Sequence, residues 1–203
     1  MKAGIMGGTF DPIHLGHLAV AEAVRESEGL DRVIFVPAGV PPHRQPPVAA
    51  PEHRLRMVRL AVAGNPGFTV CDWEVNRTEP AYTINTVRHL ARQLGPGAEI
   101  QLILGLDAFG EIGAWHQVTQ LVREISFLVI DRPGAPPPGN LPAGVTYRRV
   151  AAGRFAISAR EIRGRVGENR SIRYLVPEPV RAYIGRQGLY RRAGGHSQGK
   201  DPT

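Results

Sequence analysis

The sequence predicts an α/β protein, a doubly wound parallel sheet with helices on both faces and a small helical part at the C-terminal end. Three observations predict it. Short apolar segments that end at glycine or proline alternate with segments whose apolar residues recur at helical spacing, and such alternation favours a parallel sheet. The length of 203 residues suits one domain. Hydrophobic residues at 42% and charged residues at 21% are ordinary globular usage.

The elements follow in order along the chain. Apolar runs predict strands at residues 2–7, 32–37, 68–75, 99–105, 126–134 and 145–151. Helical spacing, caps and stop signals predict helices from residue 15 onward, over 53–64 and 83–95, from Ser158, and from Pro177 or Pro179 to Gly188. Ser158 and Glu161 have the spacing of a capping box. We expect one domain over residues 1–190 and, at 191–203, a polar, glycine-rich tail that is disordered.

Several classes of protein do not fit this composition. Cys71 is the only cysteine, so neither an internal disulfide nor a cysteine-based zinc site is expected. No stretch approaches the roughly 18 apolar residues of a membrane span, and the first residues lack the apolar core of a signal peptide. These observations predict a cytoplasmic protein that does not enter a membrane.

The chain is strongly basic, with a formal net charge of +7. Lysine occurs only at positions 2 and 200, so 23 of the 25 basic residues are arginine. A nucleic-acid-binding protein usually gathers its basic residues in one patch, whereas these arginines are scattered and aromatic residues are only 6%. We therefore expect no nucleic-acid partner. A positive field that attracts small polyanionic substrates is the better interpretation, although coding bias toward arginine would give the same composition.

The segment GGTFDPIHLGH, residues 7–17, carries the candidate chemistry. Gly7 and Gly8 allow the backbone to turn sharply and to approach a ligand closely. A turn of this kind before a helix N-terminus forms an anion site. His14 and His17, three residues apart at the helix start, share a face and can donate hydrogen bonds to phosphate oxygens. Two histidines alone would be better explained by capping, by packing or, with Asp11, by metal binding than by phosphate contact.

The full segment resembles the motif G-x-F-D-x-x-H-x-G-H of the nucleotidyltransferase superfamily, matched here at Gly8, Phe10, Asp11, His14, Gly16 and His17. The resemblance implies a Rossmann-like α/β domain that transfers a nucleotidyl group from a nucleoside triphosphate. Catalytic roles at His14, His17 and Arg163 are implied. The implied ATP-binding residues are Gly7, Gly8, Thr9, Phe10, Gly16, Gly105, Asp107 and Ser158.

Further motifs, in order along residues 3–190, resemble the bacterial nicotinate-mononucleotide adenylyltransferases. The matching segments are Pro41-Pro42-His43-Arg44, Ala81-Tyr82-Thr83-Ile84-Asn85-Thr86, Gly105-Leu106-Asp107-Ala108, Trp115-His116, Ile157-Ser158-Ala159-Arg160-Glu161-Ile162-Arg163 and the C-terminal stretch from Tyr174 to Tyr190. The resemblance implies adenylyl transfer from ATP to nicotinate mononucleotide, giving deamido-NAD and pyrophosphate. The implied substrate-binding residues are His43, Arg44, Tyr82, Thr83 and Trp115. Trp115 would stack on the pyridinium ring.

Five positions depart from the family pattern: Arg44, Asn85, Leu106, Ala159 and Arg160. Arginine grips phosphate differently from the usual lysine. Simpler roles also stay open, namely core packing for Trp115, helix capping for Asp107 and Ser158, and a solvated surface position for Arg163.

The resemblance implies Mg²⁺ held mainly through the ATP phosphates, because that ion keeps water and phosphate ligands, so no metal site built from protein residues is expected. Nicotinamide mononucleotide and phosphopantetheine are the alternative acceptors. The sequence leaves a homo-oligomer open.

Overall fold

The computed structural model describes residues 1–39, 47–130, 139–153 and 155–191. Its centre is a six-stranded, all-parallel sheet in the order β3-β2-β1-β4-β5-β6. The strands are β1 (Lys2–Gly8), β2 (Arg32–Pro37), β3 (Phe68–Val70), β4 (Glu99–Gly105), β5 (Ser126–Ile130) and β6 (Tyr147–Val150). The strand order reverses between β1 and β4, which confirms the doubly wound parallel sheet. Ligands of such sheets bind beyond the carboxyl ends of the strands at that point.

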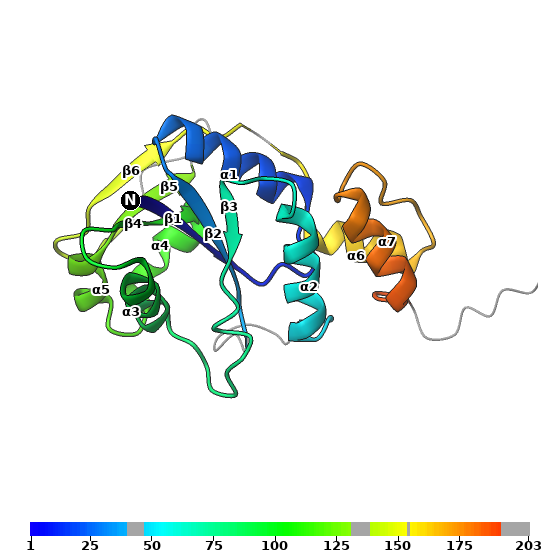
Figure 1. The fold of residues 1–203 in the computed structure, drawn as a ribbon, viewed down its shortest axis with the longest axis horizontal. Helices are drawn as coiled ribbons and strands as arrows, with labels where there is room; N and C mark the ends of the chain where they lie inside the picture. The colour runs from blue at the N-terminus through cyan, green and yellow to red at the C-terminus, as the bar shows by residue number, and fades with distance from the viewer. Residues whose placement is uncertain (40–46, 131–138, 154, 192–203) are drawn as a thin grey trace, which may run out of the picture.

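Helices cover both faces of the sheet (Figure 1). They are α1 (Leu15–Ser27), α2 (Pro51–Val62), α3 (Thr83–Leu94), α4 (Leu106–Gly110), the 3-10 turn η1 (Ile112–Ala114), α5 (Val118–Glu124), α6 (Ala159–Gly167) and α7 (Glu178–Gln187). The last two form the small C-terminal helical part, which lies beyond α2 at one end of the molecule (Figure 1). None of the helices in the described ranges combines the length and apolar character needed to cross a membrane.

Alternation along each strand divides the buried side chains between two cores. In β2, Val33 and Phe35 pack with α1 and α2 in one core, whereas Ile34 and Val36 pack with α3 and α5 in the other. We call these the first and the second core. The first core also takes in Ile162 of α6 and residues of α7, so the C-terminal helices share the main hydrophobic interior. Both faces of the sheet are therefore apolar, as expected for a buried parallel sheet.

The predicted boundaries hold for most elements, with three corrections. The first strand runs on through Gly8 instead of breaking at Gly7. The strand expected over 68–75 ends at Val70, because the chain then enters a turn in which the Asn76 N–H donates to the Asp72 carbonyl. The short helices between Leu106 and Glu124 were not anticipated. Part of the strand expected over 126–134 and all but residue 191 of the tail lie outside the described residues.

Candidate functional site

A cavity of about 790 Å³ opens at the switch point of the sheet. The carboxyl ends of β1 and β4, the N-terminus of α1 and the segment before α6 form its wall. Its lining residues are Met6, Gly7, Gly8, Phe10, His14, Gly16, His17, Val20, Ile103, Leu104, Gly105, Leu106, Asp107, Ala108, Ile130, Gly153, Phe155 and Ala156. The structure thus brings together the two segments, 7–17 and 105–108, that the sequence places after separate strands, because β1 and β4 are hydrogen-bonded neighbours.

The turn between β1 and α1 depends on Phe10 rather than on the two glycines. Gly7 and Gly8 belong to the strand, and the left-handed backbone conformation falls on Phe10, with φ at 48°. The Phe10 ring is buried and packs edge-on against His17, with ring centroids 5.1 Å apart. A Cβ atom on Gly8 would lie 3.0–3.3 Å from that ring. Gly8 is therefore needed for close packing, and our expectation of a glycine-made turn is wrong.

His14 and His17 stack against each other at the start of α1. Their ring centroids are 3.6 Å apart at an interplanar angle of 22°, which confirms the shared face. The His14 backbone N–H donates to Nδ1 of His17 at 3.2 Å, so the neutral His17 ring carries its proton on Nε2. Nδ1 of His14 is buried without a partner among the described residues. The pair can therefore offer hydrogen bonds to an anion in the cavity.

Burial keeps both imidazoles neutral near pH 7. It lowers the pKa of His14 to about 4. Burial, and then the nearby His14, lower the pKa of His17 to about 3. A neutral ring is a hydrogen-bond donor without the desolvation cost of a buried cation. Within the described ranges, no three histidine, cysteine, aspartate or glutamate side chains form a group that could hold a metal ion.

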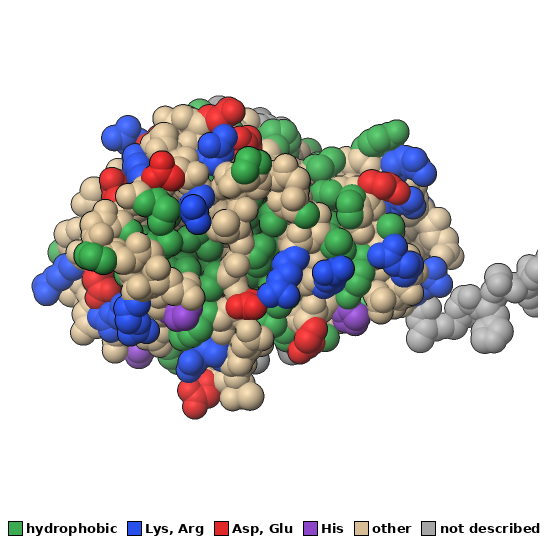
Figure 2. Space-filling model, viewed as in Figure 1, with side chains coloured by type: hydrophobic (Ala, Val, Ile, Leu, Met, Phe, Trp, Pro, Cys, Tyr) green, Lys and Arg blue, Asp and Glu red, His purple; other side chains and the backbone are tan. Residues whose placement is uncertain are grey.

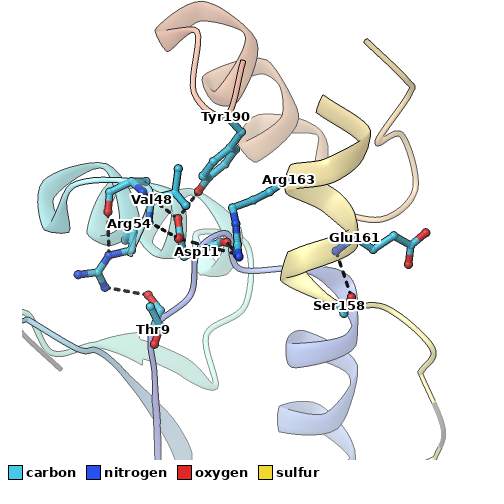
Figure 3. A network of polar contacts seen from close by, with 9 residues as sticks. Thr9, Asp11, Val48, Arg54, Ser158, Glu161, Arg163 and Tyr190 are labelled. Atoms are coloured by element: carbon cyan, nitrogen blue, oxygen red, sulfur yellow. Dashed lines mark hydrogen bonds and ion pairs between the residues drawn. The ribbon is translucent and has the colours of Figure 1, made fainter. Parts of the chain in front are cut away.

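Asp11, in the same turn, is the centre of a polar network (Figure 3). Its side chain, 5% exposed, accepts from the backbone N–H groups of Val48 and Ala49 and from the Tyr190 hydroxyl. Its carbonyl accepts from Nη1 of Arg163 at 2.6 Å. Arg163 is thus a member of this network and does not line the cavity wall. It is also not the fully solvated arginine of the simpler interpretation.

A second arginine, Arg54, holds the turn between β1 and α1 in place through hydrogen bonds to backbone carbonyls. Arg54 of α2 is 0% exposed. Its guanidinium donates to the carbonyls of Thr9, Gly39 and Ala49 at 2.8, 3.0 and 3.2 Å. The Thr9 carbonyl is therefore hydrogen-bonded to Arg54, and Thr9 does not line the cavity. Sequence patterns could not single out Arg54, because an arginine in an amphipathic helix reads as a surface residue.

Ser158 caps a helix as expected, whereas Asp107 does not. Ser158 caps α6 and accepts from the Glu161 N–H at 3.2 Å, whereas the Glu161 carboxylate pairs with Arg165. The expected capping box is therefore half formed. Asp107 lines the cavity from within the first turn of α4, whose cap is Gly105, so it is not the N-cap residue. Ser158 does not line the cavity.

Of the expected acceptor-binding residues, Tyr82 and Thr83 lie at the N-terminus of α3, outside the cavity wall. Tyr82 is the N-cap residue and Thr83 the first helical residue. The Tyr82 ring stacks on His116, with centroids 4.1 Å apart. The neighbouring Trp115 packs partly against the second core, so core packing explains part of its environment. His43 and Arg44 lie outside the described residues.

Sequence reasoning missed Phe155, which lines the cavity although it is 46% exposed. A Cβ atom on Gly16 would lie 3.3 Å from the Phe155 Cβ and 3.1 Å from His14 Nδ1. A lone aromatic residue just before the Ser158 segment was the available signal in the sequence. Phe155 therefore lies close to Gly16, beside the N-terminus of α1.

The chain is similar to known proteins in both sequence and fold. Residues 5–165 match the family model described as cytidylyltransferase-like. A protein of Moorella thermoacetica named "Probable nicotinate-nucleotide adenylyltransferase" is 44% identical over 94% of this chain and 92% of its own length. A relative of the same name from Exiguobacterium sibiricum is 43% identical over 94% and 99%. A solved structure of the Plasmodium falciparum nicotinic acid mononucleotide adenylyltransferase, complexed with NaAD, superposes with a TM-score of 0.74 at 19% identity, covering 93% of this chain and 97% of that one.

Proposed function

Because the chain belongs to the nicotinate-nucleotide adenylyltransferase family, we propose that it transfers the adenylyl group of ATP to nicotinate mononucleotide, giving deamido-NAD and pyrophosphate. One observation in the structure supports this most directly. A stacked pair of neutral histidines and the N-terminus of α1 face a cavity at the switch point of the sheet. Hydrogen-bond donors at a helix N-terminus suit the phosphates of a nucleotide.

The reaction requires no covalent intermediate on the protein. An oxygen of the mononucleotide 5′-phosphate attacks the α-phosphorus of ATP in line, and the bond from that phosphorus to the bridging oxygen of the pyrophosphate breaks. A phosphate oxygen is already an anionic nucleophile, so positioning and charge stabilisation supply most of the catalysis. Nε2–H of His17 is the donor best suited to the phosphate charge, since Nδ1 of the same ring is occupied.

The other roles follow from the placement of each group. Gly105 and Asp107, which line the same cavity as the histidines, would bind the nucleoside part of ATP, with Phe155 as an apolar wall. Arg163, tethered through Asp11 beside the histidine turn, would stabilise the leaving pyrophosphate.

Mg²⁺ would be held through phosphate oxygens and water, and Asp107 is the carboxylate on the cavity wall that could support it. When bound, the ion would neutralise phosphate charge.

The acceptor would lie toward the N-terminus of α3. The first-turn N–H groups of a helix attract a carboxylate, and Thr83 is at that position. Tyr82 and Trp115 would frame the pyridine ring. A carboxylate on the acceptor is therefore favoured over an amide at this end.

One assay with three acceptors tests the proposal. The protein is incubated with Mg-ATP and nicotinate mononucleotide, nicotinamide mononucleotide or phosphopantetheine, and pyrophosphate and the adenylylated product are measured. We expect the highest kcat/KM with nicotinate mononucleotide. The absence of pyrophosphate with every acceptor would refute adenylyl transfer, whereas a preference for either other acceptor would refute only the assignment of the substrate.

A further inference from the structure

Tyr190 joins the C-terminal end of the described chain to the turn that carries the histidines. Its hydroxyl donates to Oδ1 of Asp11 at 2.7 Å, across 179 residues of sequence (Figure 3). Gly188, with φ at 62°, ends α7, and the Leu189 N–H returns to the Ile184 carbonyl. Tyr190 then adopts a φ of 65°. A left-handed conformation is uncommon for a tyrosine, so surrounding contacts must hold the residue in place.

Those contacts make the Tyr190 hydroxyl a permanent donor. The ring packs against the first core. Burial and the negative charge of Asp11 raise the pKa of the phenol far above its usual range. The hydroxyl therefore keeps its proton and remains a donor to Asp11.

Asp11 is surrounded by groups that set the geometry of the site. Its two oxygens accept from the N–H groups of Val48 and Ala49 at 2.8 and 3.1 Å. Oδ2 lies 3.8 Å from Nη1 of Arg163, which is hydrogen-bonded to the Asp11 carbonyl instead. The carboxylate thus stands close to Arg163 without a short ion pair.

The Tyr190 hydroxyl is one of three donors that hold the carboxylate in this place. Without it, Oδ1 would accept only from the Ala49 N–H and Oδ2 only from the Val48 N–H. Held by two donors instead of three, the carboxylate could close the 3.8 Å separation from Arg163 and form a short, charge-assisted pair with it. Such a pair would neutralise the guanidinium and pull it away from an anion in the neighbouring site.

We propose that Tyr190 is a positioning residue for adenylyl transfer, which acts through Asp11 to keep Arg163 available to the phosphates of ATP. This inference rests on the proposed function. It makes the C-terminal segment part of the machinery rather than a structural appendage.

Tyr190→Phe removes only the hydroxyl, and Tyr174→Phe is the matched control, because Tyr174 lies in the same part of the fold and is 80% exposed. Because the guanidinium of Arg163 would then be drawn into a pair with Asp11, we expect kcat/KM for Mg-ATP to fall roughly 10- to 100-fold in Y190F. KM for nicotinate mononucleotide should change less than about twofold, because the Tyr190 network does not include α3. The control should match the wild type.

A double-mutant cycle distinguishes positioning from a purely structural role. If Tyr190 acts through Arg163, Y190F should cost much less in an Arg163→Lys background than in the wild type. Losses of kcat/KM that add in the double mutant would overturn the inference. So would an unchanged KM for ATP with a loss of activity that only matches the loss of folded protein. A folded Y190F with wild-type kinetics would also overturn it.

Two further measurements keep the outcomes separate. Wild-type protein that forms no pyrophosphate would refute the proposed function itself, whereas the inference fails only in the variants. If Y190F does not fold, Arg163→Lys is measured in the same way, because Arg163 is the group through which Tyr190 acts. We expect the same selective loss toward ATP, and wild-type kinetics in this variant would overturn the inference.

Discussion

The two histidines act as neutral rings held in one orientation. Stacking at 3.6 Å and the edge contact of His17 with Phe10 restrict both rings. The backbone bond to Nδ1 sets the tautomer of His17. Preorganised donors of this kind need no rearrangement when negative charge develops on a phosphate. The capping role and the proposed phosphate role of His14 are therefore compatible, because the ring sits at the cap of α1 and also lines the cavity.

Replacing His17 tests this role at the scale of one residue. His17→Ala should lower kcat about 100- to 1,000-fold, the usual cost of one preorganised donor, while the protein stays folded, because the ring lies at a cavity wall. His89→Ala is the control, since the His89 ring stacks on Trp73 away from the cavity. Steady-state pyrophosphate release and thermal unfolding are measured for both. Near-normal turnover in the His17 variant would contradict the assignment.

At the scale of elements, Glu74 connects the end of β2 to the first turn of α3. Its carboxylate accepts from the Thr86 hydroxyl at 2.6 Å and from the Gly39 N–H. Gly39 must be glycine here, because a Cβ atom would lie 2.1 Å from the Glu74 carbonyl oxygen. Burial raises the pKa of Glu74 to about 7. The position of α3, and with it Thr83, therefore depends on a carboxyl group that titrates near neutrality.

The raised pKa of Glu74 predicts that the stability of the protein falls as the pH rises. Between the unfolded pKa near 4.5 and the folded pKa near 7, the folded protein holds a proton that the unfolded chain has released. Stability from this group is therefore full below about pH 4.5 and is lost as the pH rises through 7. Glu74→Gln cannot titrate, so its free energy of unfolding should fall less than that of the wild type between pH 5 and pH 8, by about 1–3 kcal/mol.

Urea unfolding at several pH values measures the difference. His14 and His17 titrate in both proteins and cancel in the comparison. Glu79→Gln is the control, because Glu79 lies on the same segment and its side chain is 79% exposed. Parallel pH profiles for the wild type and the Glu74 variant would show that the carboxyl is not perturbed.

At the scale of the whole molecule, the positive charge is spread rather than concentrated. Figure 2 shows the Lys and Arg side chains scattered among acidic and apolar ones over the face in view. Several arginines are paired, for example Arg88 with Glu124 and Arg181 with Glu178. A net charge of +7 on such a surface attracts small polyanions from a distance without forming a track for a nucleic-acid backbone.

Ionic strength should therefore affect the KM for Mg-ATP more than it affects kcat. Raising NaCl from about 20 to about 200 mM shortens the screening length from roughly 20 to 7 Å, and we expect KM for Mg-ATP to rise a few-fold while kcat changes little. Duplex DNA should bind weakly, with a dissociation constant no tighter than about 10⁻⁶ M at physiological salt. Titration calorimetry measures the dissociation constant for duplex DNA. An ATP KM insensitive to salt, or tight salt-sensitive DNA binding, would contradict this view of the charge.

Local patterns carried most of the element predictions, because helix caps, stop residues and strand hydrophobicity act over a few residues. The strand from Glu99 to Gly105 has the predicted bounds, and α3 begins at Thr83 as predicted and ends at Leu94, one residue before the predicted end. The strand expected over 68–75 was too long, because an apolar run does not reveal where hydrogen bonding to the neighbouring strand ends. Here the pairing of β3 with β2 ends at Val70. The segment after Leu106 was missed because its helical pieces are too short for a periodic pattern.

By itself, the sequence determined the alternation of strands and helices and the GGTFDPIHLGH segment with its paired histidines, since both depend on neighbours along the chain. Only the tertiary structure decided that β1 lies beside β4 and that Phe10, rather than a glycine, makes the turn. It also placed Arg54 and Tyr190 around that turn. The contacts of Arg54 with Thr9 and of Tyr190 with Asp11 join residues that are 45 and 179 positions apart in the sequence. Such contacts leave no periodic or local signal, because they depend on how the whole core packs.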